Sequence, residues 1–264
     1  MKEAQFALHE EIEERHWWFL GRRRILQQIV HAYAAPSPDT VIIDVGCGTG
    51  GNIGCFANEY ATFGIDPCSQ AIASAKKRFP RTEFMCGIAP QDLAERMKTA
   101  KLLLLTDVLE HVEDDRALLN QLIAALSPGA GILLTVPADM SLWSQHDESF
   151  GHFRRYDHTS LSLLWKGLPV SVRLLSAYNT RLYPVIKTAR FFSRITGSAL
   201  GSAGTDFRMP LCPVNMALER IFAGEGHLLT ALLRGESHRP LRYGASLIAL
   251  LEVSKEHAVS LPVS

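Results

Sequence analysis

Residues 41–52 read Val-Ile-Ile-Asp-Val-Gly-Cys-Gly-Thr-Gly-Gly-Asn, so an apolar, β-branched run ends in an acid and enters a glycine-rich turn. This pattern predicts a buried parallel strand, a tight turn and the N-terminus of a helix. Glycines at alternate positions leave the backbone without Cβ atoms, which allows a ligand to approach it closely. We therefore expect an adenosine-containing cofactor at this turn, and two classes of cofactor fit the pattern.

The acid before the glycines distinguishes the two classes, whereas the glycine spacing does not. Gly46, Gly48 and Gly51 satisfy the G-x-G-x-x-G dinucleotide fingerprint, which is a weak signal on its own. A pyrophosphate bound at a helix N-terminus would be repelled by the carboxylate of Asp44, two residues before the first glycine. A cofactor that carries an amino acid instead offers a cationic ammonium and a sulfonium, which this carboxylate attracts. Asp44 therefore favours the second class.

A second acid follows the next apolar run. Residues 61–65 predict a short strand that ends at Asp66, about 20 residues beyond the glycine turn. An acid in this place suits a bidentate hydrogen bond to ribose hydroxyls, and both cofactor classes need it. It also suits the N-terminus of the following helix, where the macrodipole favours a negative charge. The two roles are compatible.

Strand and helix patterns alternate regularly through the first half of the chain. Apolar strands are expected at 40–45, 61–65, 82–86, 101–106 and 130–136, and two later ones at 170–179 and 243–253. Helices fill the intervals, with the clearest at 114–126 and a further group between 180 and 240. Such alternation predicts a parallel, doubly wound sheet that is covered on both faces. Its ligands are expected at the carboxyl ends of the strands, beside Asp44, Asp66, Gly87 and Asp107.

Further segments extend the pattern beyond the glycine turn. Residues 102–112 read Leu-Leu-Leu-Leu-Thr-Asp-Val-Leu-Glu-His-Val, residues 14–19 read Glu-Arg-His-Trp-Trp-Phe, and a polar stretch rich in His and aromatic residues covers 139–158. Together with Asp44-x-Gly46-x-Gly48-x-Gly50, they resemble the class I S-adenosylmethionine-dependent methyltransferases. The resemblance is to a bacterial group that acts on small molecules and on glycan or lipid intermediates.

The resemblance implies an α/β fold, a Rossmann-like doubly wound seven-stranded sheet with an N-terminal lid helix and a helical cap inserted before the last strand. It divides the chain into lid helices at 1–38, a cofactor-binding core at 39–180, a cap or acceptor insertion at 181–241, and the last strand and tail at 242–264.

The resemblance also implies S-adenosylmethionine as the cofactor and S-adenosylhomocysteine as the product. In the N-terminal helix an aromatic face would attract the cationic groups, and an arginine would meet the cofactor's carboxylate. The implied cofactor-binding residues are Asp44, Gly46, Cys47, Gly48, Gly50, Asn52, Asp66, Pro67, Gly87, Ile88, Asp107, Val108, Trp18 and Arg22.

Candidate catalytic residues lie in the two segments that follow strands 101–106 and 130–136. They are His146, His152, His111, Asp107 and Tyr156. A histidine removes a proton from an acceptor hydroxyl near neutral pH, although methyl transfer needs a base only if the acceptor must lose a proton. The alternative is structural: Glu110 and His111 would support the loop, and Asp147 with Arg154 and Arg155 would form an ion-paired scaffold. No metal site is expected, because His146, Asp147 and His152 in a loop do not define a ligand geometry.

Composition limits the partners. Lys plus Arg and Asp plus Glu are 27 each, so the formal net charge is zero and a nucleic-acid substrate is not expected. The five cysteines are odd in number and lack Cys-x-x-Cys spacing, which favours reduced residues in the cytoplasm. Neither a signal peptide nor a transmembrane segment is expected. The sequence leaves peripheral membrane contact, a monomer and a homodimer open, with a small molecule as the acceptor.

Two rival functions stay open. An NAD(P)-dependent oxidoreductase would use the same glycine turn, but it is opposed by Asp44 and by the lack of a Tyr-x-x-x-Lys set for hydride transfer. A non-catalytic methyltransferase-like subunit that stabilises another protein is opposed by the nearly intact motifs.

Overall fold

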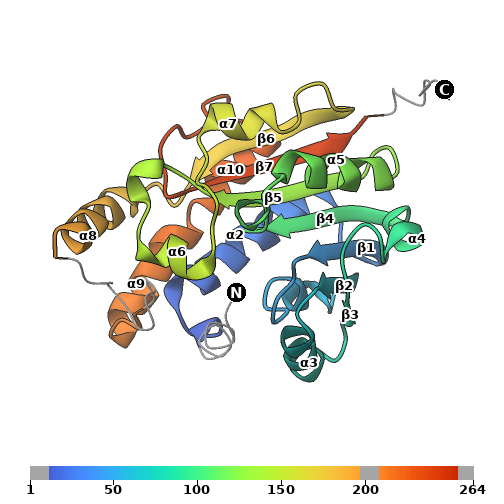
Figure 1. The fold of residues 1–264 in the computed structure, drawn as a ribbon, viewed down its shortest axis with the longest axis horizontal. Coiled ribbons are helices and arrows are strands. Elements are labelled where there is room, and N and C mark those ends of the chain that lie inside the picture. Colours follow the sequence, from blue (N-terminus) through green and yellow to red (C-terminus); the bar gives the residue numbers. More distant parts are fainter. Residues whose placement is uncertain (1–11, 197–207, 255–264) are drawn as a thin grey trace.

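A computed structural model of the chain describes residues 12–196 and 208–254. Within these residues one seven-stranded sheet runs in the order β3-β2-β1-β4-β5-β7-β6 (Figure 1). Every strand is parallel to its neighbours except β7, which is antiparallel to both β5 and β6. The strands are β1 (Ser37–Val45), β2 (Tyr60–Asp66), β3 (Glu83–Cys86), β4 (Ala100–Thr106), β5 (Gly131–Pro137), β6 (Val170–Tyr178) and β7 (Ser246–Val253).

The expected fold class is confirmed. All the strands lie within a few residues of the predicted positions, because a strand buried on both faces is apolar along its whole length. Leu102 to Leu105 of β4, for example, are fully buried. The parallel register brings the carboxyl ends of β1 to β4 to one edge of the sheet, which we call the rim.

Helices cover both faces of the sheet. On one face, apolar side chains of α2, α3 and α10 share a core with β1, β4 and β7. On the other face, α4, α5 and α7 bury Met97, Leu119 and Leu161 against the sheet. The helices are α2 (Trp17–Tyr33), α3 (Ser69–Arg78), α4 (Ala94–Met97), α5 (Asp115–Ala125), α6 (Gln145–Phe150), α7 (His158–Leu163), α8 (Tyr183–Thr196), α9 (Cys212–Ala223) and α10 (Gly226–Leu233), with short 3-10 helices η1 (Ile53–Phe56), η2 (Leu109–His111) and η3 (Met140–Leu142).

The N-terminal helix α2 is part of the core over most of its length. Ile25, Leu26 and Ile29 recur at helical spacing and are fully buried against the sheet. The first turn lies against α9, where the Trp17 ring packs edge-on to Phe222 with centroids 5.9 Å apart. The first two turns reach the rim, where Arg22 pairs with Asp107 at the end of β4.

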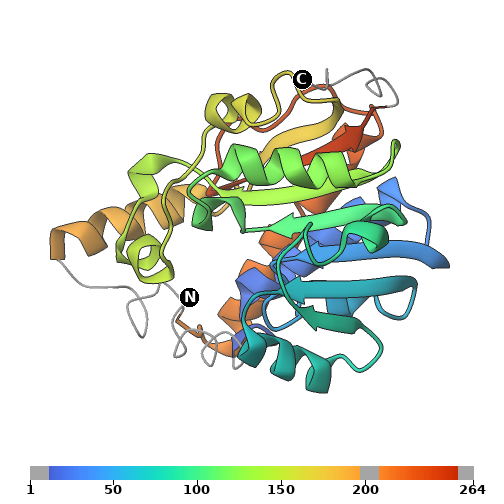
Figure 2. The same ribbon diagram turned by 45° about the vertical axis from the view of Figure 1, so that its right-hand side comes forward.

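The helices inserted before the last strand divide into two parts. As expected, α8, α9 and α10 lie between β6 and β7 in the sequence. However, α9 and α10 pack against α2 on one face of the sheet. α8 projects away from the body of the molecule (Figures 1 and 2). It contacts η3, and its Arg190 approaches Asp147 of α6.

The helix expected directly after the glycine turn is replaced by the short 3-10 helix η1. Only the segment from Gly51 to Glu59 separates the turn from β2, which leaves too little chain for a longer helix. A pyrophosphate site relies on the N–H groups and dipole of a helix N-terminus. The short helix offers little of either, which further disfavours a dinucleotide. In the two described ranges no helix has the length and hydrophobicity that crossing a membrane requires.

Candidate functional site

The glycine turn leaves open space at the rim. Gly46 has φ of +72°, and a Cβ on it would lie 2.7 Å from Cγ2 of Val108, so both the backbone angle and the neighbour require glycine. Gly48 has φ of +53°, and within the described residues no atom lies within 4 Å of the place its Cβ would occupy. The turn can therefore receive a ligand directly on its backbone.

Asp44 is buried at the end of β1 and is unsatisfied. Its exposed fraction is 0%, and neither carboxylate oxygen has a hydrogen-bond partner among the described residues. Burial raises the pKa of Asp44 to about 8; the charge of Arg22 opposes the rise and that of Asp66 adds to it. A buried carboxyl without a partner is costly in free energy, so this position fits a ligand that brings a positive charge.

Asp66 at the end of β2 holds the turn in shape. Its Oδ2 accepts a hydrogen bond from the N–H of Gly48 (2.9 Å), and its Oδ1 accepts one from the N–H of Cys68 (2.8 Å). Each carboxylate oxygen can accept a second hydrogen bond, so the side chain keeps the capacity to bind two hydroxyls. Between these positions, Pro67 shapes the turn after the strand. Cys47 is buried, and burial raises the pKa of its thiol far above the ordinary range.

Arg22 of α2 connects the N-terminal helix to the end of β4. Its guanidinium forms an ion pair with Asp107 and stacks over the ring of Trp18, 4.2 Å from the ring centroid. Within the described part of the chain the Nε of Arg22 has no hydrogen-bond partner, although the side chain is buried. Asp107 has φ of +56°, a conformation that is uncommon for non-glycine residues, and such residues cluster at functional sites.

Asn52 completes this connection. Its Nδ2 donates a hydrogen bond to Oγ1 of Thr106 (2.9 Å), and its Oδ1 lies 3.5 Å from Nη2 of Arg22. The start of α2, the glycine turn and the end of β4 thus meet at one place.

The segment after β3 closes the rim on its other side. The Gly87 N–H donates to the carbonyl of Asp66 (3.1 Å), and the Ile88 N–H donates to Asp92 (2.7 Å). The side chain of Ile88 is 59% exposed and offers an apolar surface at the rim.

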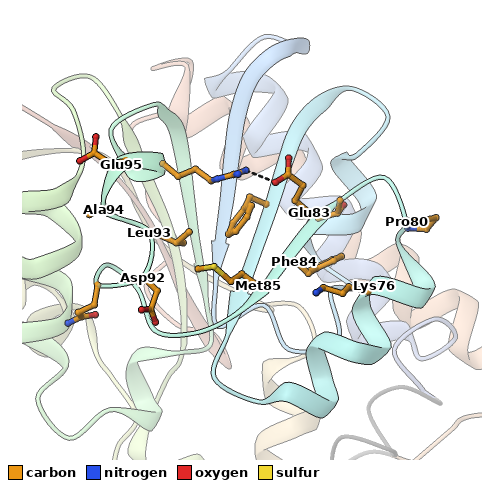
Figure 3. Close-up of a pocket in the computed structure, with 13 residues that line it drawn as sticks. Lys76, Pro80, Glu83, Phe84, Met85, Asp92, Leu93, Ala94 and Glu95 are labelled. Carbon is orange, nitrogen blue, oxygen red and sulfur yellow. Dashed lines mark hydrogen bonds and ion pairs between the residues drawn. The ribbon is translucent and has the colours of Figure 1, made fainter.

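A hollow on the outer edge of the sheet is a separate feature. Figure 3 shows that it lies between β3 and the segments around α3 and α4, with Lys76, Glu83, Met85 and Asp92 among its lining residues. No residue of the glycine turn lines it. We therefore place the candidate site at the rim rather than in this hollow.

Three histidines expected from the sequence gather beside Asp107. The His111 and His152 rings have centroids 4.7 Å apart, and the His146 and His152 centroids are 6.3 Å apart. Burial lowers the pKa of His111 to about 4. Burial, followed by the charge of Arg190, lowers the pKa of His146 well below its ordinary value. His111 and His146 are therefore neutral at pH 7.

Asp147 anchors the loop that carries two of these histidines. Its carboxylate is fully buried, accepts hydrogen bonds from Nε of Arg155 (2.8 Å) and from the N–H of Ser144 (2.9 Å), and contacts Nδ1 of His152 at 2.9 Å. Arg190 of α8 approaches it to 3.7 Å. Asp147 and Arg155 thus form the ion pair that the structural alternative expected, whereas Arg154 pairs with Asp115 instead of Asp147.

Tyr156 lies in a different set of contacts from the histidines. Its buried hydroxyl donates a hydrogen bond to Asp115 (2.7 Å), which also pairs with Arg154 at 2.8 Å. Burial and the hydrogen bond to Asp115 raise the pKa of Tyr156 far above its ordinary value. These contacts support a structural role for Tyr156 rather than a catalytic one.

Glu13, which lies over the glycine turn, was not predicted from the sequence. Its carboxylate is buried, accepts a hydrogen bond from Oγ1 of Thr49 (3.0 Å) and pairs with Arg78 of α3. A Cβ on Gly51 would lie 2.7 Å from Glu13 Oε2. Glu13 belongs to an acidic run whose pattern is typical of a solvent-exposed helix face. Nothing in the neighbouring sequence therefore indicates that this side chain is buried at the site.

The sequence matches the family described as "Methyltransferase domain" over residues 18–168, which is more than half of the chain. The chain belongs to this family. The matched part of this methyltransferase-domain chain contains Arg22, the glycine turn, Asp66, Asp107 and the three clustered histidines.

Two characterised relatives match shorter parts of the methyltransferase domain. Trans-aconitate 2-methyltransferase of Variovorax paradoxus is 32% identical over 110 residues, which cover 39% of this chain and 40% of that protein. Norajmaline N-methyltransferase of Rauvolfia serpentina is 29% identical over 109 residues, which cover 38% of this chain and 37% of that protein. The chain thus spans about 40% of the length of the curated relatives it matches.

Solved structures match nearly the whole chain at low identity. The plantazolicin methyltransferase BamL, in complex with a triazolic desmethylPZN analog and SAH, has a TM-score of 0.56 and 16% identity over 96% of this chain and 91% of that one. The [4+2]-cyclase SpnF has a TM-score of 0.55 and 14% identity over 88% of this chain and 80% of that one. These likenesses show that the fold of the methyltransferase domain is shared. They do not show which reaction this protein catalyses.

Proposed function

We propose that the protein transfers a methyl group from S-adenosylmethionine to a small-molecule acceptor. The observation that carries this proposal is the buried, unsatisfied carboxyl of Asp44 at an open glycine turn. Membership of the methyltransferase domain family and the SAH bound to a solved relative support it. The methylated atom, whether O, N or C, is left open.

The residues at the rim fit the parts of this cofactor. Asp44 suits the cationic end, Asp66 suits the ribose hydroxyls, and Arg22 can exchange its contact with Asp107 for the cofactor's carboxylate. Trp18 and Ile88 offer apolar and aromatic surface on either side of the turn. Gly46, Cys47, Gly48 and Gly50 would present backbone to the cofactor.

The cofactor supplies a methyl carbon that is activated by its sulfonium sulfur. The acceptor atom forms a bond to this carbon as the carbon–sulfur bond breaks, and the sulfur keeps the electron pair as a neutral thioether. An acceptor hydroxyl also gives up its proton to a base or to water. The chain's main contribution is to place the acceptor in line with that bond. His111, His146 and His152 are the candidates for accepting the proton.

The acceptor is proposed to bind between Asp107 and the segment from Asp139 to His158, with α8 at its outer side. Met140 and Phe153 are 57% and 55% exposed there, which favours an acceptor with apolar surface. In this proposal residues 1–38 form the lid, residues 39–180 the cofactor-binding core and residues 242–264 the last strand and tail. Residues 181–241 contribute to acceptor binding through α8.

Calorimetric titration with S-adenosylhomocysteine tests the proposal, with NADH as the parallel ligand. We expect micromolar binding of the first ligand and none of the second. Binding of NADH alone would favour an oxidoreductase. The absence of binding for both ligands would contradict the proposal and favour a non-catalytic subunit.

The Asp66→Ala variant is expected to bind S-adenosylhomocysteine about 10- to 100-fold more weakly, because hydrogen bonds to a charged group are worth roughly 1.5–3 kcal/mol. The comparison is with Glu83→Ala, which removes an exposed acid at the outer edge of the sheet. Circular dichroism checks that both variants fold. Equal affinity of the two variants would remove the ribose role of Asp66.

A further inference from the structure

Glu110, His111 and His152 form a cluster that the sequence does not place together. The first two belong to η2 after β4, and His152 lies on the loop after α6. One ligand atom from each lies within 4.8 Å of the others. This set differs from His146, Asp147 and His152, the group from which no metal site was expected.

The carboxylate in this cluster is incompletely satisfied. Glu110 is 1% exposed, and its Oε2 has no hydrogen-bond partner within the part of the chain that the structure describes. Burial, reinforced by the charge of Asp107, raises the pKa of Glu110 well above its ordinary value. A buried carboxylate oxygen without a partner requires an explanation, and a role in binding a cation is one.

The neighbours of both histidines orient them as metal ligands. Nδ1 of His152 contacts the buried carboxylate of Asp147 at 2.9 Å, which leaves Nε2 for a ligand. The His111 ring is hydrogen-bonded to the backbone of Gly151. Histidines that bind metals almost always use their second nitrogen in this way, toward a carboxylate or a backbone carbonyl.

We propose that Glu110, His111 and His152 bind one divalent transition-metal cation, whose remaining coordination positions take oxygen atoms of the methyl acceptor. The metal site stands on the cluster alone, whereas the role toward the acceptor rests on the proposed function. Two imidazoles and one carboxylate suit zinc, cobalt or iron better than magnesium or calcium, which prefer all-oxygen ligand sets.

The three ligand atoms of the cluster lie within reach of one ion. Three atoms bound at about 2.0–2.1 Å in a tetrahedral arrangement lie about 3.4 Å from each other. The separations in the cluster, which are all within 4.8 Å, would therefore shorten by at most about 1.4 Å through side-chain rotation when an ion binds. His111 and His152 retain some exposure, so the open positions can be reached from the rim beside Asp107. An ion there would lower the pKa of a bound hydroxyl and orient it toward the methyl carbon. With His111 and His152 bound to the ion, the proton of that hydroxyl would pass to His146 or to water.

Titration of the full chain with Co²⁺, after treatment with a chelator and without a histidine tag, tests the site. We expect one Co²⁺ per chain with visible d–d absorption, and at least tenfold weaker binding in Glu110→Gln and His111→Ala. The Glu110→Gln variant keeps the shape of the side chain, so it tests the ligand without a cavity. The matched control is His227→Ala, which removes an exposed histidine on α10. Equal Co²⁺ affinity in all four proteins, or no binding by the wild type, would overturn the proposal.

A second titration tests whether the remaining coordination positions of the metal ion can bind oxygen atoms. Acetohydroxamate, which binds metals through two oxygen atoms, is expected to change the absorption of the Co²⁺-loaded wild type. An unchanged spectrum would overturn the role toward the acceptor. S-adenosylhomocysteine binding, measured in the same preparation, separates the two proposals: if it binds normally while Co²⁺ does not, the metal site alone is wrong.

Discussion

The Asp44→Asn variant is expected to bind S-adenosylhomocysteine about 100-fold more weakly than the wild type and to be more stable at pH 8.5. Both effects have one cause, a carboxyl that is fully buried without a hydrogen-bond partner in the described structure. When the cofactor is absent, no hydrogen bond stabilises the negative charge of Asp44, so that charge destabilises the folded protein. When it is bound, that charge meets the cofactor's cationic groups, and losing one member of a buried charge pair costs roughly 2–5 kcal/mol.

The stability effect has a definite pH dependence. The pKa of Asp44 is raised from 3.8 to about 8 on folding, so the unfolded chain loses this proton near pH 4 and the folded chain keeps it until about pH 8. Between these values the folded state binds more protons, so wild-type stability falls as the pH rises and levels off above pH 8. This contribution amounts to about 3 kcal/mol between pH 5.5 and 8.5, and the Asn variant lacks it.

Urea unfolding at pH 5.5 and pH 8.5 measures the effect. The free energy of unfolding of Asp44→Asn, relative to the wild type, should be greater at the higher pH. The control Asp39→Asn changes an exposed acid at the start of the same strand and should show no such trend. If the difference between Asp44→Asn and the wild type does not change with pH, the carboxyl of Asp44 is already charged or compensated in the folded protein.

How far the sequence predicts this site depends on the range of each interaction. Asp44 and Asp66 end strands whose apolar pattern is local, and parallel pairing then brings them to the same edge. These positions were predicted because neighbours in the sequence decide them. The shortness of η1 was not predicted, because the glycine pattern indicated a helix directly after the turn.

Other features depend on contacts between distant segments. Ser144 and Asp147 form a local capping box at the start of α6, but the same carboxylate also meets Arg155 and Arg190 of α8. Likewise, His152 reaches Glu110 and His111 only because the loop after α6 folds back to η2, where the Phe153 N–H donates to the carbonyl of Glu110 at 2.8 Å. The periodicity of the sequence does not predict contacts between such distant segments.

The Asp147→Ala variant is expected to lose about 3–5 kcal/mol of unfolding free energy, because removing one member of a buried charge network leaves the opposite charges in place. Arg155 is 3% exposed and Arg190 is 10% exposed in their side chains, so neither can recover full hydration without disrupting the loop. Burial opposes the charge of Asp147, but hydrogen bonds from His152 and Arg155 outweigh it and hold the pKa of Asp147 well below its usual range. The stability from this group is therefore present above about pH 4 and is lost as the pH falls further.

A matched variant separates the contribution of the ion pairs to stability from that of the helix cap. Asp157 is also an acid in a capping box, at the N-terminus of α7, but it is exposed. Asp157→Ala should cost only about 1 kcal/mol, the typical value of a cap. Urea unfolding of both variants at pH 7 gives the difference, and S-adenosylhomocysteine affinity should stay close to that of the wild type in each because neither acid touches the glycine turn. If Asp147→Ala is no less stable than Asp157→Ala, the buried arginines do not depend on Asp147, and the loop that carries His146 and His152 is anchored by its other contacts.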